Sequence, residues 1–582
     1  MWGLMATNIS SDFFTASLEL KLDDLSFCDM NLKSLDKWLT ELPSVQLGDT
    51  SKALFGAVEE IFALKCDETF RFDAIYALHP YLEQILGVLE KNLAHRDLAG
   101  HNENIIDLAQ QFRCYMARIY SHIALSTHNE LFNNEFSLFS FRYKKNLTKI
   151  RLLSTFFALE QFSLLKYQQL VLYRNAFIGQ WRIAHNLYHI AYEHKFDLDS
   201  ISQITKMAHS LNCIGKVYKQ INLLDLLNTH QIRPIEIHAL YQCSFQWIDL
   251  IHLNSQESAL SRYFLNIKKD FPPVLNNLHL NKTQQDFFIE TQGLLEHINL
   301  INLPQHRALS KIERAFLSPS LIFHVQNLLN NTPERRYERY TFSSTIQLTF
   351  GLQSAHYYLS HTQKFEDTLF LDTKIKFQAN SKLLSTWNSE IRSSQSTPTY
   401  LDQEAKHIYS CNILDISVNG YRMRWRGSLP QQLRTGEFLL IQENHKSPWR
   451  GGTIRWLKQM PDKHIEFGVE ILSQELTPCA VQISTQNKNY HPALLMKNNV
   501  LNEMNLSLIV PGSQMCKEHQ NVFLRVQQTQ VKIYFTKAKL ISQSFTQLDF
   551  EFLNEDDSTI VNQFIEEHAE TIKKQDLWES LK

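Results

Sequence analysis

The spacing of apolar residues changes near residue 332, and this change constrains the fold more than any other feature of the sequence. Before it, apolar residues mostly recur at intervals of three and four, as in the stretch 105–123. Such spacing places side chains along one face of an α-helix. After it, apolar and polar residues alternate, as in 413–425, which is typical of strands with one buried face. The sequence therefore predicts a multidomain α+β protein.

The two patterns also suggest domain boundaries. We expect an N-terminal all-α helical domain over residues 1–331, in which Pro and Gly are sparse within the helical stripes. An antiparallel β-barrel is predicted over 332–480, interrupted at about 360–408 by an insertion that is largely loop. A second β-rich domain should occupy 481–555, and a C-terminal helix should occupy 556–582.

Composition excludes several classes of function. Lys and Arg number 58 against 60 Asp and Glu, so no overall basic field draws the chain to nucleic acid. The eight cysteines are scattered without a CxxC pair, which argues against a disulfide framework and favours a reducing cytoplasm. No apolar run approaches about eighteen residues and no signal-peptide pattern opens the chain. We therefore expect a cytoplasmic protein without a transmembrane segment.

Metal and enzyme motifs are also missing from the sequence. His185 and His189 lie one helical turn apart and could in principle share a metal ion. No HExxH pattern accompanies them, so a packed or exposed pair is the commoner explanation. The sequence lacks Walker A, GxGxxG and GxSxG motifs and any catalytic cysteine context. We predict no metal site, no catalytic residue and no enzymatic activity.

The most informative segment is the predicted strand at 413–425. Because side chains alternate along a strand, small polar groups gather on one face and apolar groups on the other. The polar set is Asp415, Ser417 and Asn419, and the apolar set is Leu414, Ile416 and Val418. Gly420 then permits a bulge or the close approach of a planar group. Beyond it, the basic stripe Arg422, Arg424 and Arg426 alternates with Tyr421, Met423 and Trp425.

Three arginines precede the first strand of the predicted barrel. Arg335, Arg336 and Arg339 lie within the segment 333–340. A guanidinium group is a planar fork that pairs with phosphate oxygens or with the O6/N7 edge of guanine, and it stacks on flat rings. Arginines followed by a polar strand face suit a small, anionic ligand that carries guanine.

These residues resemble a known pair of motifs. RxxxR, formed by Arg335 and Arg339, followed by (D/N)xSxxG, formed by Asp415, Ser417 and Gly420, is similar to the signature of PilZ domains. PilZ domains are receptors for bacterial cyclic di-GMP. The resemblance implies that the two arginines grip guanine edges and phosphates. It also implies that the second motif cradles another base against the barrel surface.

The resemblance extends over roughly 332–475. The segments 449–456 and 467–472 resemble the last strands of the same barrel. The spacing between Arg339 and Asp415 is longer than is usual in the family, and the insertion at 360–408 accounts for the excess. Long surface insertions cost little stability.

The resemblance implies a cyclic di-GMP-binding effector that passes the state of this second messenger to an unidentified protein partner through its helical domain. It further implies a role in motility, attachment or exopolysaccharide control. The predicted ligand-binding residues are Arg335, Arg336, Arg339, Asp415, Ser417, Asn419 and Gly420. The alternative is a helical scaffold or chaperone-like adaptor with a degenerate barrel that does not bind the nucleotide. Saturable binding of cyclic di-GMP by residues 332–480 would distinguish the two.

Overall fold

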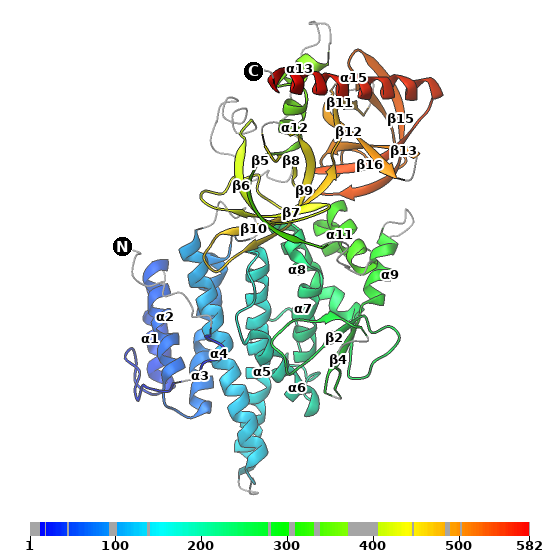
Figure 1. Ribbon diagram of the computed structural model, residues 1–582. Coiled ribbons are helices and arrows are strands. Elements are labelled where there is room, and N and C mark those ends of the chain that lie inside the picture. Colours follow the sequence, from blue (N-terminus) through cyan, green and yellow to red (C-terminus); the bar gives the residue numbers. More distant parts are fainter. Residues whose placement is uncertain are drawn as a thin grey trace. The chain divides into compact units, whose positions relative to one another are not determined.

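The computed structural model describes residues 12–580, with the exception of several short segments and one long one. The exceptions are residues 18, 44–45, 92, 94–101, 137–139, 206, 278–280, 284, 302–308, 331–337, 370–405, 445–446, 484–488 and 501–502. The chain forms two compact units, which Figure 1 colours along the sequence. The first comprises Met1–Thr229, Pro234–Leu317 and Leu328–Asn331. The second comprises His230–Arg233, Ser318–Asn327 and Thr332–Lys582.

The first unit consists mainly of helices, which confirms the prediction from three-to-four spacing. They are α1 (Leu32–Glu41), α2 (Leu47–Ala63), α3 (Glu68–Leu89), α4 (Glu103–Asn133), α5 (Phe141–Val171), α6 (Gln180–Glu193), α7 (Ile214–Leu226), α8 (Pro234–Trp247), α9 (Gln292–Ile301) and α10 (Lys311–Phe316), with the 3-10 turns η3 (Thr229–Gln231) and η4 (Ile248–Leu250). Most of α11 (Pro319–Asn330) belongs to the second unit. No helix within the described ranges is long and apolar enough to cross a bilayer.

Local signals fix where several of these helices begin. The side chains of Asn31 and Asp67 accept hydrogen bonds from backbone N–H groups in the first turns of α1 and α3. Ser310 and Glu313 form a reciprocal capping box at the start of α10. These caps satisfy donors that a helix start leaves unpaired.

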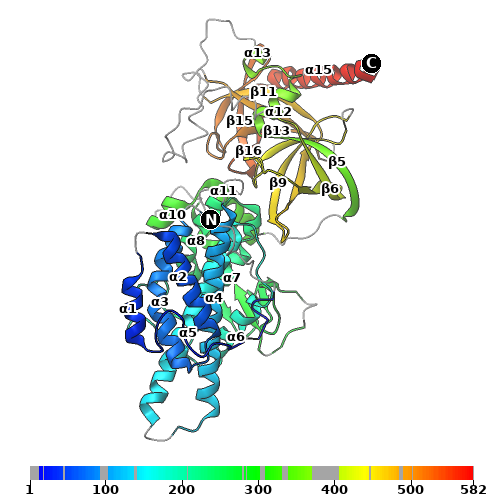
Figure 2. The ribbon, with the colours of Figure 1, turned by 90° about the vertical axis from the view of Figure 1, so that its left-hand side faces the viewer.

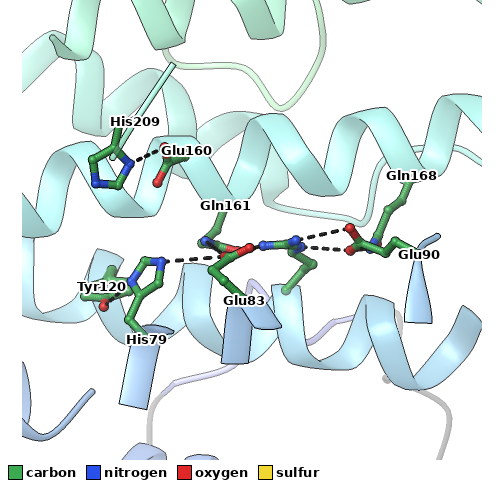
Figure 3. Close-up of polar contacts among 9 residues, drawn as sticks. His79, Glu83, Glu90, Tyr120, Glu160, Gln161, Gln168 and His209 are labelled. Carbon is green, nitrogen blue, oxygen red and sulfur yellow. Dashed lines mark hydrogen bonds and ion pairs between the residues drawn. The ribbon is translucent and has the colours of Figure 1, made fainter. Parts of the chain in front are cut away.

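A buried polar network joins α3, α4 and α5 (Figure 3). Arg113 of α4 is 2% exposed and donates hydrogen bonds to Glu83, Glu90 and Gln161. Its Nε lies 3.0 Å from Glu90 Oε1, and its Nη1 lies 2.9 Å from Gln161 Oε1. Burial by itself would raise the pKa of Glu83, but Arg113 and His79 hold that pKa well below its usual range. One guanidinium therefore ties three helices together.

A small antiparallel sheet, which the sequence did not predict, interrupts the helical unit. It consists of β1 (His252–Asn254), β2 (Tyr263–Leu265), β3 (Val274–Leu275) and β4 (Phe287–Glu290), in the order β1-β4-β2-β3. Each strand has only two to four residues. Strands this short contain too little alternation to distinguish them from loops, so the all-α description of residues 1–331 omits them.

His185 packs into the core of the helical unit. Its Nδ1 lies 2.7 Å from the Tyr218 hydroxyl, and its Nε2 lies 3.0 Å from the Phe271 carbonyl oxygen. Burial lowers the pKa of His185 to about 4, so the ring is neutral at pH 7. Within the described ranges, no cluster of three or more His, Cys, Asp or Glu side chains could hold a metal ion.

The second unit begins with a closed antiparallel barrel. Its strands are β5 (Tyr340–Phe350), β6 (Tyr409–Ser417), β7 (Gly420–Trp425), β8 (Phe438–Gln442), β9 (Arg450–Gln459) and β10 (Ile465–Ser473), in the closed order β10-β7-β6-β5-β8-β9. Two helices, α12 (Leu352–Leu359) and α13 (Phe365–Thr368), follow β5. Most of the predicted insertion, residues 370–405, lies outside the described residues.

The predicted second β-rich region is also a closed six-stranded barrel. Its strands are β11 (Leu476–Gln482), β12 (His491–Val500), β13 (Glu503–Pro511), β14 (Asn521–Val526), β15 (Thr529–Ile541) and β16 (Phe545–Phe552), in the closed order β11-β12-β13-β16-β15-β14. The predicted C-terminal helix is α15 (Glu555–Ser580). β11 begins a few residues before the predicted boundary at 481, because the link from β10 contains no Gly or Pro to mark a turn.

The two barrels have the same strand connectivity. When β5 to β10 are matched in order with β11 to β16, the neighbours of every strand are the same in both barrels. For example, β5 pairs with β6 and β8, and β11 pairs with β12 and β14. The last hairpin of each barrel, β9–β10 and β15–β16, contains two shifts of register. The second unit is therefore a tandem of two barrels of one topology.

An apolar core joins the two barrels. α12 contributes Leu352, Ala355 and Leu359 to it. The barrel strands contribute Phe438, Leu440, Leu476, Leu494, Met496, Ile509 and Phe545. A separate core fills the second barrel, and Val561 and Ile565 of α15 pack into it. Because α12 directly follows β5, the first strand of one barrel is anchored to the other barrel.

Candidate functional site

Barrel closure brings Asp415 and the residues that pair with it across the sheet onto one side of β5, β6, β7, β10 and β9. Cross-strand partners face the same side of a sheet. The paired residues Thr341, Asp415, Arg422, Gly468 and Trp456 therefore form a row across the strands, which we call the Asp415 row. Tyr421, Met423 and Trp425 are buried within the barrel, so Arg422 and Arg424 face outward as the alternation predicts.

Of the predicted apolar face of Leu414, Ile416 and Val418, only Ile416 faces the barrel interior, where it pairs with the buried Tyr421. The pairing of β6 with β7 shifts in register between Ile413 and Asp415, which marks a bulge. Ile413 is 3% exposed, whereas Leu414 and Ile416 are half-buried and Val418 is 77% exposed. The bulge at Leu414 lets Ile413 and Ile416, three residues apart, both face the barrel interior, and Val418 is exposed because it lies in the turn after β6.

The motif residues Ser417 to Gly420 form a tight hairpin between β6 and β7. Val418 and Asn419 are the two turn residues, and Ser417 Oγ donates to the Gly420 carbonyl oxygen at 3.3 Å. The Asn419 carbonyl oxygen accepts a hydrogen bond from Ile471 N at 2.9 Å. The exposed amide of Asn419 thus sits on a backbone held by β10.

Gly420 is required by the barrel itself. A Cβ atom built on Gly420 would lie 2.2 Å from the Val469 carbonyl oxygen of β10. That distance is far below van der Waals contact, so no other residue fits without moving a strand. Barrel packing therefore requires glycine at this position, and the role of Gly420 in ligand binding stays a prediction.

An ion pair joins the two predicted motifs. Arg339 Nη1 lies 2.9 Å from Asp415 Oδ1, and the Arg339 side chain is 47% exposed. Arg422 Nη1 approaches the other oxygen of Asp415 at 3.4 Å. Arg335 and Arg336 lie outside the described residues. The structure therefore brings Arg339 to Asp415 and leaves the other two arginines undescribed.

Glu466 of β10 neutralises much of the predicted basic stripe. Its carboxylate lies 2.6 Å from Arg422 Nη2 and 3.3 Å from Arg424 Nη2, and it is 3% exposed. Burial would raise the pKa of Glu466, but hydrogen bonds from Arg422, His464 and Arg424 hold it below its usual value. The sequence analysis missed Glu466, although its position in the alternating segment 464–472 was a usable signal.

Trp456 is a second residue that the sequence analysis did not assign to the site. A Cβ atom on Gly468 would lie 2.0 Å from Trp456 Nε1, so the indole covers the glycine. Gly468 in turn pairs with Arg422. The Asp415 row therefore ends in a flat, half-buried ring. A glycine in the middle of a strand is the signal that could have revealed this close approach.

Two family models match this chain, and the boundary between them, near residue 260, falls within the first unit. A family model described as the N-terminal domain of the cyclic-di-GMP receptor FimW matches residues 33–258. A second model, described as the middle PilZ domain of that receptor, matches residues 263–398 and 370–478. The chain belongs to the PilZ-domain cyclic di-GMP receptor family.

A curated relative extends this likeness over most of the chain. The cyclic-di-GMP receptor FimW of Pseudomonas aeruginosa is 23% identical over 517 residues, which cover 81% of this chain and 82% of the relative. No solved structure matches the chain. The matches to the PilZ family model end at residue 478, near the start of the second barrel.

The second barrel lacks the PilZ motif at the equivalent positions. Its hairpin pair Val500 and Glu503 corresponds to Ser417 and Gly420 of the first barrel. The residue before β11 is Glu475, whereas Arg339 precedes β5. At these equivalent positions, therefore, the motif residues are present in the first barrel and absent from the second.

Proposed function

We propose that the chain is a cytoplasmic receptor that binds cyclic di-GMP on the Asp415 row of the first barrel. It is an effector rather than an enzyme, and it transmits the bound state to a protein partner through its helical unit, in control of motility, attachment or exopolysaccharide output. The observation that carries the proposal is the Arg339–Asp415 ion pair, which unites the two motifs across the barrel surface.

The chemistry of the row suits this ligand. Cyclic di-GMP carries two phosphate charges and two guanine bases. Arg339 is half exposed and can exchange its contact with Asp415 for a phosphate or for the O6/N7 edge of guanine. Asp415 is then free to accept hydrogen bonds from the N–H groups of a guanine. Trp456 and the guanidinium of Arg422 offer flat surfaces for stacking.

The role of the remaining motif residues is part of the same proposal. Ser417 and Asn419 lie on the hairpin next to Asp415, where their polar groups can reach a bound base. Arg335 and Arg336 would complete the clamp on the phosphates. A scaffold or adaptor with a barrel that cannot bind is the second candidate, and the intact set Arg339, Asp415 and Ser417 argues against it.

Calorimetric titration of the full chain with cyclic di-GMP tests the proposal. Charge-assisted hydrogen bonds contribute about 1.5–3 kcal/mol each, so Arg339→Ala should weaken binding roughly tenfold to a hundredfold. Arg339→Lys should recover little of this, because lysine lacks the planar fork.

A matched control exists on the second barrel. Lys539 pairs with Asp549 at 3.0 Å and is 48% exposed, close to the exposure of Arg339. Lys539→Ala removes a similar surface ion pair from the barrel without the motif, and it should leave binding unchanged. Failure of the parent chain to bind, or equal binding by the parent and Arg339→Ala, would favour the scaffold.

A further inference from the structure

The α4–α5 hairpin projects from the helical unit, and its end carries exposed aromatic side chains. Both views of the ribbon show the two helices continuing past the ends of their neighbours (Figures 1 and 2). Within the described residues, none between His128 and Asn146 is buried, whereas Thr127 and Leu147 are. We call the last turns of α4 and the first turn of α5 the hairpin tip. His194, at the end of α6, contacts His128 and Phe132 at the base of this tip, with ring centres 4.7 and 6.0 Å away, and the rest of the Phe132 ring stays at the surface.

Aromatic side chains are concentrated at the hairpin tip. Phe132 is 72% exposed, Phe141 is 68% exposed and Tyr143 is 46% exposed. In the described part of the first unit, the only other exposed aromatic side chain is Phe271. Leaving three large rings in water at one place costs free energy that burial would recover. Such a cluster indicates a surface that is covered when the protein functions.

Three basic side chains of the hairpin tip accompany these rings and outnumber its two acidic ones, Glu130 and Glu135. Arg142, Lys144 and Lys145 are all exposed on the first turn of α5, and Lys144 Nζ lies 5.5 Å from the centre of the Phe136 ring. Tyr143 is oriented by a hydrogen bond of 2.7 Å from its hydroxyl to Glu130, which leaves its ring at the surface. The combination of apolar rings and cations suits a partner that is apolar beneath a negative surface.

The shape of the tip decides between a protein and a lipid partner. At their observed exposures the three rings together present on the order of 300–450 Å². A stable protein interface needs roughly 800 Å² from each partner. A bilayer makes no such demand, because rings inserted at the headgroup boundary are surrounded by lipid on all sides.

We propose that the hairpin tip is a docking surface for an anionic lipid bilayer. Phe132, Phe141 and Tyr143 enter the boundary between headgroups and acyl chains, and Arg142, Lys144 and Lys145 contact the lipid phosphates. Each buried phenylalanine should raise partitioning about tenfold, and each cation should raise it about fivefold on an anionic surface. This surface lies in the helical unit and does not depend on nucleotide binding.

Sedimentation of the full chain with lipid vesicles tests this. The chain should sediment with vesicles that contain phosphatidylglycerol, and sodium chloride should weaken the association by screening the cations. Phosphatidylcholine vesicles should bind it at least tenfold more weakly. A double variant, Phe132→Ser with Phe141→Ser, should lose at least tenfold on phosphatidylglycerol. The double variant Lys144→Gln with Lys145→Gln should also bind phosphatidylglycerol vesicles at least tenfold more weakly than the parent. This difference in affinity should disappear at high salt.

Ile178→Ser is the matched control, because Ile178 is 57% exposed in the same unit and lies just before α6, about 20 Å of helix away from the His194 end that contacts Phe132. It should bind like the parent. The proposal is overturned if the parent does not sediment with phosphatidylglycerol vesicles, or if Ile178→Ser loses as much affinity for them as the double phenylalanine variant. It is equally overturned if sedimentation velocity finds a dimer of this chain that the phenylalanine variant abolishes, because the tip would then contact a second copy.

Discussion

Replacing Arg113 with alanine would leave two carboxylates of the helical unit without their cation. Removing one partner of a buried ion pair lowers the free energy of unfolding by about 3–5 kcal/mol. Glu83 is 35% exposed and Glu90 is 19% exposed, so solvent screens part of the loss. We therefore expect Arg113→Ala to lower the free energy of unfolding by about 3 kcal/mol, near the lower end of this range.

The size of this loss should depend on pH in a direction set by Glu83. In the parent, its folded pKa lies below its unfolded pKa, so its contribution is complete at pH 7 and is lost only in the acid range. In Arg113→Ala, burial remains as the first influence and raises the pKa of Glu83. As the pH falls, protonation of Glu83 then removes part of the destabilisation of the variant. The difference between parent and variant should shrink between pH 7 and about pH 5.

Urea unfolding followed by far-ultraviolet circular dichroism at the two pH values measures this difference. Arg182→Ala, which removes an exposed arginine of α6, should change stability by less than about 0.5 kcal/mol at either pH. A loss below about 1 kcal/mol for Arg113→Ala at pH 7, or an equal loss at both pH values, would refute the role assigned to the network.

Three further predictions concern the first barrel. Gly420→Ala should lower the free energy of unfolding by about 1–3 kcal/mol, because its Cβ would meet the Val469 carbonyl oxygen. Gly56→Ala, in helix α2, where a Cβ meets no atom within 4 Å, should instead raise the free energy of unfolding by up to about 1 kcal/mol. Thermal unfolding in which the two variants shift the melting temperature in the same direction would contradict this. Glu466→Gln should lower the free energy of unfolding most at pH 7. Because the folded pKa of Glu466 is lowered, the difference in stability between parent and variant should vanish only as acid protonates Glu466. A difference in stability that stays constant down to about pH 3 would contradict the assignment. Ser417→Ala should change stability by less than about 0.5 kcal/mol, since its hydrogen bond measures 3.3 Å, yet it should weaken cyclic di-GMP binding in calorimetry.

The predictions that the structure confirms were those made from the local spacing of apolar residues. The change of period near residue 332 separates the helices from the strands, because periodicity depends only on which face of an element is buried. The alternation of Tyr421, Met423 and Trp425 with the arginines holds for the same reason. Alternation failed at Leu414, which lies in a bulge, and at Val418, which lies in the hairpin turn. A bulge depends on the pairing with the neighbouring strand, which the strand's own residues do not determine.

The motif residues and their order along the chain were legible in the sequence, but their contacts were not. Glu466 reaches Arg422 because barrel closure places β10 beside β7, and Gly420 is glycine because that closure brings the Val469 carbonyl against it. The equal connectivity of the two barrels was also hidden, since the second barrel lacks the motif that made the first recognisable. The sequence by itself determined the long helices and barrel strands and most of the faces that they bury, but not the short strands β1 to β4 or the bulge at Leu414. Only the tertiary structure decided which strands are neighbours, because pairing depends on packing between segments far apart in the chain.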